Sequence, residues 1–292
     1  MAIDSASPAT PSSSSKSGEF ANGMTKAPRN VAWYQPTLPK GLPELPHRIF
    51  KDYSNIPDSE IVDHIYRVRD KAWEILPYPC IGVFRFLDFP ATLNPIYPEV
   101  LERVRNGETF LDLGCCFGQD IRKLAFDGAP SESLIGVDTE ATFLELGYEL
   151  FRDRDTLKSR FYTQDVFAED FLAEWHGKID IIFLGSFLHL FSFEKQKHVV
   201  SQLEKLLRKH KGAIVFGRHM GAENGGNLRK NALGWDLYHH SPETIHQLFD
   251  EDLEGKWEVE SELVTYGSEG WDKGRNWQGN DVKQQNFWAK KL

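Results

Sequence analysis

The stretch F-L-D-L-G-C-C-F-G-Q-D, residues 110–120, decides the fold. It begins as an apolar, strand-like run, passes glycines at Gly114 and Gly118, and continues into an amphipathic helical pattern. A strand that turns into a helix at glycines allows the backbone to approach a bound nucleotide-like ligand closely. Residues 110–120 are therefore predicted to form a strand–turn–helix unit with a ligand at the turn.

Further apolar runs with strand character follow at similar intervals, and helical patterns separate them. Continuous apolar strands that alternate with helices are typical of a parallel sheet covered on both faces. On this basis the sequence predicts a doubly wound α/β fold. Predicted strands span residues 109–113, 134–138, 160–165, 179–184, 212–217, 257–264 and 286–292, and predicted helices span about 61–75, 96–105, 120–127, 194–210 and 242–251.

The chain before the sheet divides into a tail and a lead-in. Residues 1–30, rich in Ser, Pro, Ala and Gly, are predicted to be a disordered tail because they cannot bury enough apolar surface to offset ordering entropy. Residues 31–107 form an N-terminal helical lead-in. Its run F-R-F-L-D-F-P, residues 84–90, is interpreted as part of a lid over the ligand crevice, and an extension that merely packs on the sheet is the alternative. Residues 108–292 form the sheet domain, with a predicted loop at 221–234.

Composition narrows the classes of function. The formal net charge is −9, so a nucleic-acid partner is not expected. The three cysteines, Cys80, Cys115 and Cys116, contain no C-x-x-C pair, so neither a metal site nor a disulfide framework is expected. The chain shows no signal-peptide pattern and no apolar run near the ~20 residues that span a bilayer. A cytoplasmic location and no membrane span are therefore predicted.

Three acidic residues recur at the carboxyl ends of three successive predicted strands. Asp112, Asp138 and Asp165 are separated by 26 and 27 residues, about one strand–helix unit each. In a doubly wound sheet ligands bind beyond the carboxyl ends of the strands, so these carboxylates are expected to line one crevice. The acid after the second strand suits a ribose diol, the acid after the third an exocyclic amine, and the acid in the first turn an ammonium group. S-adenosylmethionine carries all three groups.

These motifs resemble the class I S-adenosylmethionine-dependent methyltransferases, with a first motif at residues 110–118, a second at 134–138 and a third at 163–167. The resemblance implies a seven-stranded, mostly parallel, Rossmann-like sheet whose last strand is antiparallel. It also implies cofactor contacts from the ends of the first four strands. The implied cofactor-binding residues are Asp112, Leu113, Gly114, Cys116, Gly118, Asp138, Thr139, Asp165, Val166 and Gly185.

The first motif departs from the family pattern at one position. The family usually has glycine where this chain has Cys116, so the methionine end of the cofactor is expected to sit slightly differently. A nicotinamide dinucleotide enzyme is the main rival, but the run lacks G-x-G-x-x-G, and Asp120 would repel a pyrophosphate. Cys115 and Cys116 are interpreted as inert packing residues, with reactive thiols as the alternative.

The segment after the fourth predicted strand, L-G-S-F-L-H-L-F at residues 184–191, helps to define the substrate. It contains neither the Asn/Asp-Pro-Pro-Tyr/Phe motif typical of base methylation nor the acids that hold magnesium in catechol methyltransferases. His189 lies in this segment, and Arg218 and His219 follow the fifth strand. They are the candidate residues that orient the substrate, and His189 could alternatively act as a general base.

More narrowly, the order of R-F-L-D-F-P, L-D-L-G-C-C-F-G-Q-D, G-V-D, Q-D-V-F and G-R-H-M is similar to fungal methyltransferases of meroterpenoid and terpenoid pathways, of the austinol and terretonin types. That similarity implies methylation of a carboxyl group on a small hydrophobic acid. A carboxylic acid of pKa ~4 is ionised at neutral pH, so no protein base is needed. The alternatives are hydroxyl O-methylation and a non-catalytic or cyclase-like role, and a homodimer stays open.

Overall fold

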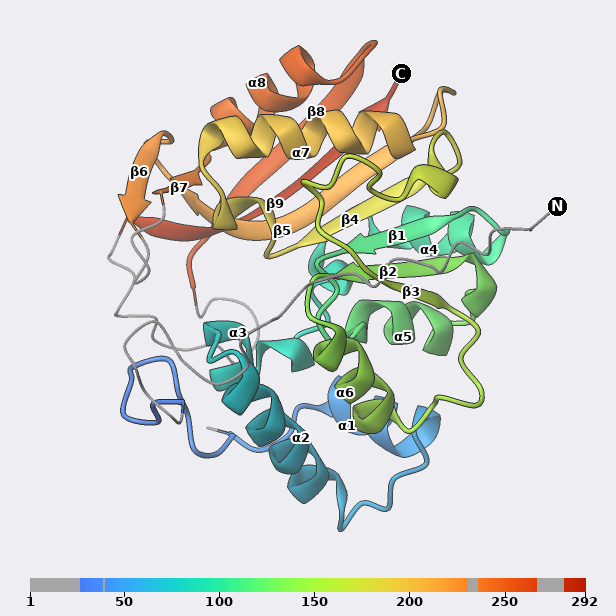
Figure 1. Cartoon of the computed structure of the whole chain (residues 1–292), viewed down its shortest axis with the longest axis vertical. Helices are drawn as coiled ribbons and strands as arrows, with labels where there is room; N and C mark the ends of the chain where they lie inside the picture. Colours follow the sequence, from blue (N-terminus) through green and yellow to red (C-terminus); the bar gives the residue numbers. More distant parts are fainter. Residues whose placement is uncertain (1–26, 39, 231–235, 267–280) are drawn as a thin grey trace, which may run out of the picture.

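A seven-stranded sheet in the order β3-β2-β1-β4-β5-β9-β8 forms the centre of the computed structural model, which describes residues 27–38, 40–230, 236–266 and 281–292 (Figure 1). β3 to β5 run parallel, and β9 runs antiparallel to both of its neighbours. The strands are β1 (Phe110–Leu113), β2 (Leu134–Asp138), β3 (Arg160–Thr163), β4 (Ile181–Gly185), β5 (Ile214–Ala222), β8 (Trp257–Val264) and β9 (Val282–Lys291). The predicted fold is confirmed, including the antiparallel last strand.

The sheet changes winding direction between β1 and β4. The chain proceeds outward from β1 through β2 to β3, and then returns to pair β4 with the other side of β1. Ligands of doubly wound proteins bind outside the carboxyl ends of the strands at such a point. The carboxyl ends of β1, β2 and β4 are therefore the edge at which to look for the functional site.

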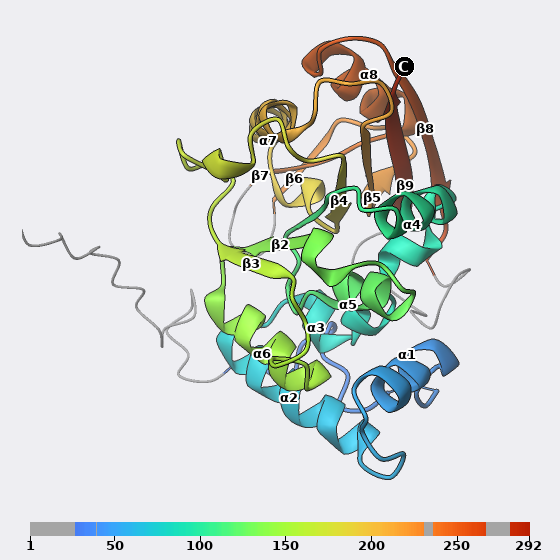
Figure 2. The ribbon, with the colours of Figure 1, turned by 90° about the vertical axis from the view of Figure 1, so that its right-hand side faces the viewer.

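Helices cover both faces of the sheet because neighbouring strand residues point to opposite sides. Phe110, with other buried strand residues of the same face, packs against α4 (Tyr97–Arg105) and α5 (Gln119–Phe126). Leu111 faces the opposite cluster, which contains α7 (Phe193–Leu206) and α8 (Pro242–Asp252). Figure 2 shows α7 and α4 on opposite sides of the sheet. A Ser241–Thr244 capping box begins α8.

Part of the predicted lead-in packs on α6 (Ala141–Phe151), and we call residues 44–93 the N-terminal cover. Figure 1 shows α2 beside α6, and at this contact Nε2 of His64 donates to the Leu150 carbonyl over 2.9 Å. Phe50, from the π-helix that precedes α2, stacks its ring on that of Phe151 with centroids 5.4 Å apart. The elements of the cover are α1 (Glu44–Arg48), a π-helix (Ile49–Tyr53), α2 (Ile61–Ile75), α3 (Pro79–Gly82), η2 (Arg85–Leu87) and η3 (Pro90–Leu93). Further 3-10 turns are η4 (Ser131–Ser133), η5 (Ala173–Trp175) and η6 (Leu188–Leu190).

The prediction of a loop at residues 221–234 is wrong in part. β5 continues to Ala222, because the antiparallel register with β9 extends from Ile214 opposite Lys290 to Ala222 opposite Val282. β6 (Asn227–Lys230) then pairs with β7 (Asp236–His239) in a two-stranded sheet. These strands satisfy backbone groups that a loop would leave to water. Three stretches lie outside the described residues: 231–235, most of the predicted tail (1–26), and 267–280, which falls between the last two predicted strands.

Candidate active site

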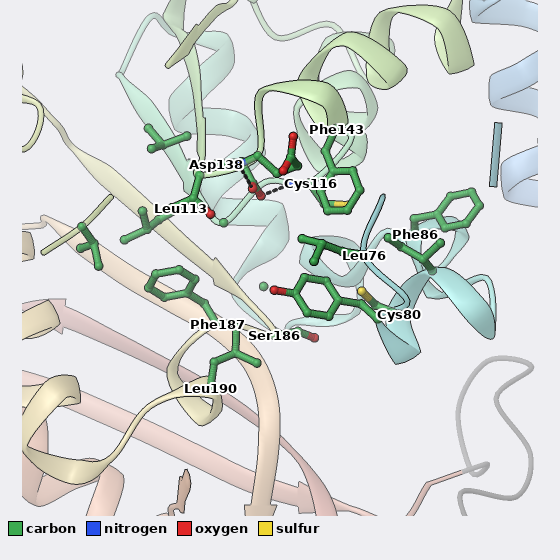
Figure 3. Close-up of a pocket in the computed structure, with 18 of the residues that line it drawn as sticks. Leu76, Cys80, Phe86, Leu113, Cys116, Asp138, Phe143, Ser186, Phe187 and Leu190 are labelled. Carbon is green, nitrogen blue, oxygen red and sulfur yellow. Dashed lines mark hydrogen bonds between the residues drawn. The ribbon is translucent and has the colours of Figure 1, made fainter. Parts of the chain in front are cut away.

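A cavity of about 460 Å³ opens at the carboxyl ends of β1, β2 and β4. Figure 3 shows Asp138, Phe187 and Cys80 reaching it from β2, from the turn after β4 and from the N-terminal cover. The sheet edge and the cover thus form one enclosure. Predicted cofactor residues that line it are Leu113, Gly114, Cys116, Asp138, Thr139, Asp165, Val166 and Gly185.

Asp138 is fixed at the centre of the sheet edge by backbone amides. Its Oδ2 accepts from the amide of Cys116 over 2.9 Å, and its Oδ1 accepts from the amide of Glu140 over 3.0 Å (Figure 3). Burial raises the pKa of Asp138, and these amides oppose the rise because they favour the ionised form. The amide of Thr139 also donates to this carboxylate, so three of its roughly four acceptor positions are used and at least one can accept from a ligand diol.

Asp112 lies just beneath the cavity rather than in its lining. Only 1% of the residue is exposed, and its Oδ2 has no hydrogen-bond partner in the described structure. Burial, followed by the charges of Asp120 and Asp138, raises the pKa of Asp112 well above its usual range. A buried acceptor of this kind favours a positively charged group placed beside it.

The turn between β1 and α5 uses left-handed backbone at three positions. Gly114 has φ +78°, Gly118 has φ +61°, and Cys116 has φ +52° between them. Glycine adopts such angles without strain, whereas another residue pays roughly 1–2 kcal/mol. Cys116, which replaces the glycine of the family pattern, therefore has a backbone conformation that glycine would adopt without strain. The Cys116 amide is also the donor to Asp138, so that hydrogen bond helps to hold the strained turn.

Asp165 and Gly118 occupy different surroundings from Asp138. Asp165 is exposed at the rim of the cavity, where its Oδ1 accepts from the amide of Phe167 over 3.0 Å. Gly118 lies outside the lining, and a Cβ there would lie 2.7 Å from the ring of Phe161 and 2.8 Å from the guanidinium of Arg122. Gly118 therefore allows helix and sheet to pack closely. The three predicted acids share one sheet edge, with Asp112 below the cavity, Asp138 in its wall and Asp165 at its rim.

The predicted substrate residues His189, Arg218 and His219 lie outside the lining of the cavity. All three are buried, with 8%, 2% and 3% of each residue exposed. The rings of His189 and His219 have centroids 6.3 Å apart. Burial lowers the pKa of His219 to about 4, so this imidazole carries no charge at neutral pH that could attract an anion. His189 and His219 thus lie near each other outside the cavity lining, whereas Arg218, the neighbour of His219 on β5, points to the opposite face of the sheet and approaches Asp88 there.

Sequence reasoning missed several lining residues that the N-terminal cover supplies. Tyr78 is 45% exposed and Leu190, from the turn after β4, is 43% exposed, and both line the cavity. Arg85 and Asp88 also line it. The signal was present in F-R-F-L-D-F-P, where these two are the charged residues in an otherwise apolar run. Sequence spacing could not show that this run faces the glycine turn.

Comparison with known proteins adds independent evidence. Residues 33–87 match the meroterpenoid methyltransferase N-terminal domain, and residues 110–210 match a methyltransferase domain. The O-methyltransferase atr3 of Stereocaulon alpinum is 38% identical over 89% of this chain and 75% of its own length. The Asnovolin E/Chermesin D methyltransferase nvfJ of Aspergillus novofumigatus is 43% identical over 65% of this chain and 68% of its own length.

The chain belongs to this family of fungal meroterpenoid methyltransferases. It is an S-adenosylmethionine-dependent enzyme, as the sequence predicts. The solved structure of the 4+2 cyclase SpnF aligns with a TM-score of 0.50 and 15% identity, over 66% of this chain and 79% of that chain. This likeness concerns the fold alone.

The cavity of this methyltransferase fits its cofactor. The buried Oδ2 of Asp112 calls for a positive group, which the ammonium and sulfonium of S-adenosylmethionine provide. Asp138, predicted to bind the ribose, lies in the cavity wall with acceptor capacity, and Asp165, predicted to bind the adenine amine, lies at the rim. Among the described residues, no group of three or more His, Cys, Asp or Glu side chains is arranged to hold a metal ion.

Within the described part of the methyltransferase, no helix is both long enough and apolar enough to cross a membrane.

Proposed function

We propose that this methyltransferase esterifies the carboxylate of an apolar small-molecule acid in fungal meroterpenoid or terpenoid biosynthesis. The observation that carries the proposal is that the basic residues of the cavity lie away from the cofactor side. Of the acidic lining residues, Asp138, Glu140 and Asp165 lie on the cofactor side, and Asp88 lies on the cover beside Arg85. The basic residues Arg85 and Lys195 lie elsewhere in the lining, on the cover and on α7. A ligand with an anionic group is attracted to these cations and repelled by the acids.

The rest of the lining suits an apolar body. Phe86, Phe143 and Phe187 border the cavity, and the surfaces that Tyr78 and Leu190 expose belong to the same cavity. Exposed apolar surface of this kind is typical of a ligand-binding site. The aromatic rings would also exclude water from the reacting groups, which strengthens the electrostatic interactions there.

Methyl transfer to a carboxylate requires the protein mainly to position the two reactants. When bound, S-adenosylmethionine supplies an electrophilic methyl group on a sulfonium centre. The acid is already ionised at neutral pH, so the protein needs to hold its carboxylate in line and exclude water. Hydroxyl methylation with His189 as base would require this ring to reach the substrate, and His189 is buried outside the cavity lining.

The test is a transfer assay with methyl-labelled S-adenosylmethionine. The purified full chain is incubated with apolar carboxylic acids and with the matched alcohols, and the organic products are treated with mild base. A methyl ester releases labelled methanol, whereas a methyl ether does not. Base-labile label from acids and none from alcohols supports the proposal. Base-stable label from alcohols alone would refute it.

A further inference from the structure

A fully buried arginine contacts the turn between β1 and α5 from outside the cavity. Arg122, on α5, has 0% of its side chain exposed and does not belong to the cavity lining. Its Nη1 donates to the Phe117 carbonyl over 2.7 Å and to the Gly118 carbonyl over 3.3 Å. Both carbonyls belong to the turn that lines the cavity at Gly114 and Cys116. The guanidinium therefore contacts the backbone of the cofactor turn without reaching the cofactor site itself.

The peptide group between Phe117 and Gly118 is held at both of its polar atoms. Its carbonyl accepts from Arg122, and its N–H donates to a backbone carbonyl of the same turn over 2.7 Å. Cys116 and Gly118, on either side of Phe117, both have left-handed backbone, which is unfavourable for residues other than glycine. Loss of the hydrogen bond from Arg122 would free this peptide group to rotate. The Cys116 amide, which donates to the carboxylate predicted to bind the ribose, would move with it.

Two glycines provide the space that this guanidinium occupies. A Cβ at Gly118 would lie 2.8 Å from Nη1 of Arg122. A Cβ at Gly147, on α6, would lie 2.4 Å from the Phe117 carbonyl oxygen and 3.3 Å from Nη1 of Arg122. Three aromatic rings surround the guanidinium, with centroids 5.2, 4.9 and 5.3 Å from Cζ for Tyr148, Phe151 and Phe161. Helix, sheet and turn thus pack closely around one buried cation.

The same guanidinium connects the turn to the N-terminal cover. Nε and Nη2 of Arg122 donate to Oδ2 and Oδ1 of Asp153, which follows α6, over 2.8 and 3.0 Å. The hydroxyl of Tyr53, in the π-helix of the cover, donates to Oδ2 of Asp153 over 2.8 Å. Burial, followed by the nearby Asp153, raises the pKa of Tyr53, so this hydroxyl stays a donor at neutral pH. A chain of hydrogen bonds therefore runs from the cover through Asp153 and Arg122 to the turn.

We propose that Arg122 is a positioning residue that holds the turn between β1 and α5 in its cofactor-binding conformation, and that Asp153 and Tyr53 couple this conformation to the N-terminal cover. Because Arg122 lies outside the cavity lining, it acts through the Phe117 carbonyl. Coupling of binding free energies is reciprocal, so the bound cofactor should in turn stabilise the contact between Tyr53 and Asp153. The inference concerns cofactor binding and does not depend on which substrate is methylated.

The first test measures adenosylhomocysteine binding to the full chain by calorimetry. Arg122→Lys keeps the charge, but its single ammonium cannot reproduce the bidentate pair with Asp153 together with the contact to the Phe117 carbonyl. The dissociation constant should rise about tenfold or more, with a stoichiometry that stays near one ligand per chain. A merely structural role would lower the stability or the stoichiometry and leave the dissociation constant unchanged.

Arg69→Lys is the matched control for a buried arginine. Arg69 is 1% exposed, pairs with Asp70 over 2.7 Å, and donates to the carbonyls of Gln35 and Pro36, and all of these partners lie in the predicted lead-in. The substitution should lower stability, yet change the dissociation constant of adenosylhomocysteine less than about twofold. Equal losses of affinity in Arg69→Lys and Arg122→Lys would overturn the inference, as would unchanged affinity in Arg122→Lys.

Tyr53→Phe tests the coupling and leaves the buried ion pair in place. In the wild-type protein, adenosylhomocysteine should slow hydrogen–deuterium exchange of the backbone amides in the π-helix that contains Tyr53. In Tyr53→Phe this slowing should be lost in the π-helix and kept at the turn between β1 and α5, and the affinity should fall about two- to fivefold. Absence of the slowing in the wild type, or full slowing in Tyr53→Phe, would overturn the coupling. If Arg122→Lys does not fold, unchanged affinity in Tyr53→Phe overturns the inference as a whole.

Discussion

Asp120 lies in the first turn of α5 with 1% of the residue exposed, and burial raises its pKa to about 7. Its Oδ1 accepts from the amide of Ala91 over 2.9 Å. Replacing it by asparagine keeps a carbonyl oxygen for that amide. In the wild type, Nε2 of Gln119 donates to Oδ2 of Asp120 over 3.2 Å, so the new Nδ2 needs a flip of the Gln119 amide, after which Oε1 of Gln119 accepts from it. Asp120→Asn therefore removes a buried charge, and one atom of the Gln119 amide lacks a partner before and after the change.

The magnitude follows from proton linkage. A carboxyl whose folded-state pKa is raised costs no stability below its unfolded pKa, and the cost grows as pH rises to the folded pKa. At about 1.4 kcal/mol per pH unit between 3.8 and about 7, the cost reaches about 4 kcal/mol. Loss of a negative charge at a helix N-terminus offsets up to about 1 kcal/mol. We expect Asp120→Asn to raise the free energy of unfolding by about 3 kcal/mol at pH 8.

The assay is urea unfolding followed by circular dichroism between pH 4 and pH 8. The increase in the free energy of unfolding of Asp120→Asn over wild type should be near zero at pH 4. It should grow steadily to about pH 7 and stay constant above that pH. Asp155→Asn is the control, because Asp155 is exposed and its replacement should change stability by less than about 0.5 kcal/mol. A gain that does not vary with pH, or a variant less stable than wild type at pH 8, would show that Asp120 is not a destabilising buried acid.

Three further predictions concern the cofactor turn and the chemistry. Asp138→Asn should weaken adenosylhomocysteine binding by about tenfold or more in calorimetry. The reason is that the new amide nitrogen would face the backbone amide of Glu140 or Cys116, both of which donate to the wild-type carboxylate. Unchanged affinity would show that Asp138 does not bind the cofactor. Cys116→Gly should change the free energy of unfolding by less than about 1 kcal/mol. Cys116→Val should lower it by more than about 2 kcal/mol, since β-branched residues disfavour φ +52°. Equal effects of the two substitutions would contradict the interpretation of a strained turn. His189→Ala should retain ester formation within about tenfold of the wild-type kcat, and complete loss with folding and cofactor binding intact would favour a base mechanism.

Most of the fold could be predicted from local sequence patterns. The spacing of Ile61, Ile65 and Val68 predicted α2, and the apolar runs after Thr109 placed the strands of the main sheet to within a few residues. Periodicity works here because burial of one helix face, or of both strand faces, requires apolar residues at those intervals. The short strands β6 and β7 were missed although they are close in sequence, because Asn227–Lys230 and Asp236–His239 are mostly polar and carry no apolar run that marks a strand.

The strand–turn–helix unit at Gly114 and the acids at the ends of three parallel strands could be predicted from the sequence, since parallel topology brings strand ends to one edge. Which charged groups face the cavity became clear from the three-dimensional arrangement of the chain. It placed Arg85 in the lining and His219 behind it, although both lie in segments that the sequence marked for function. The physical reason is that burial and charge pairing depend on contacts between segments far apart in the chain, as when Asp88 meets Arg218.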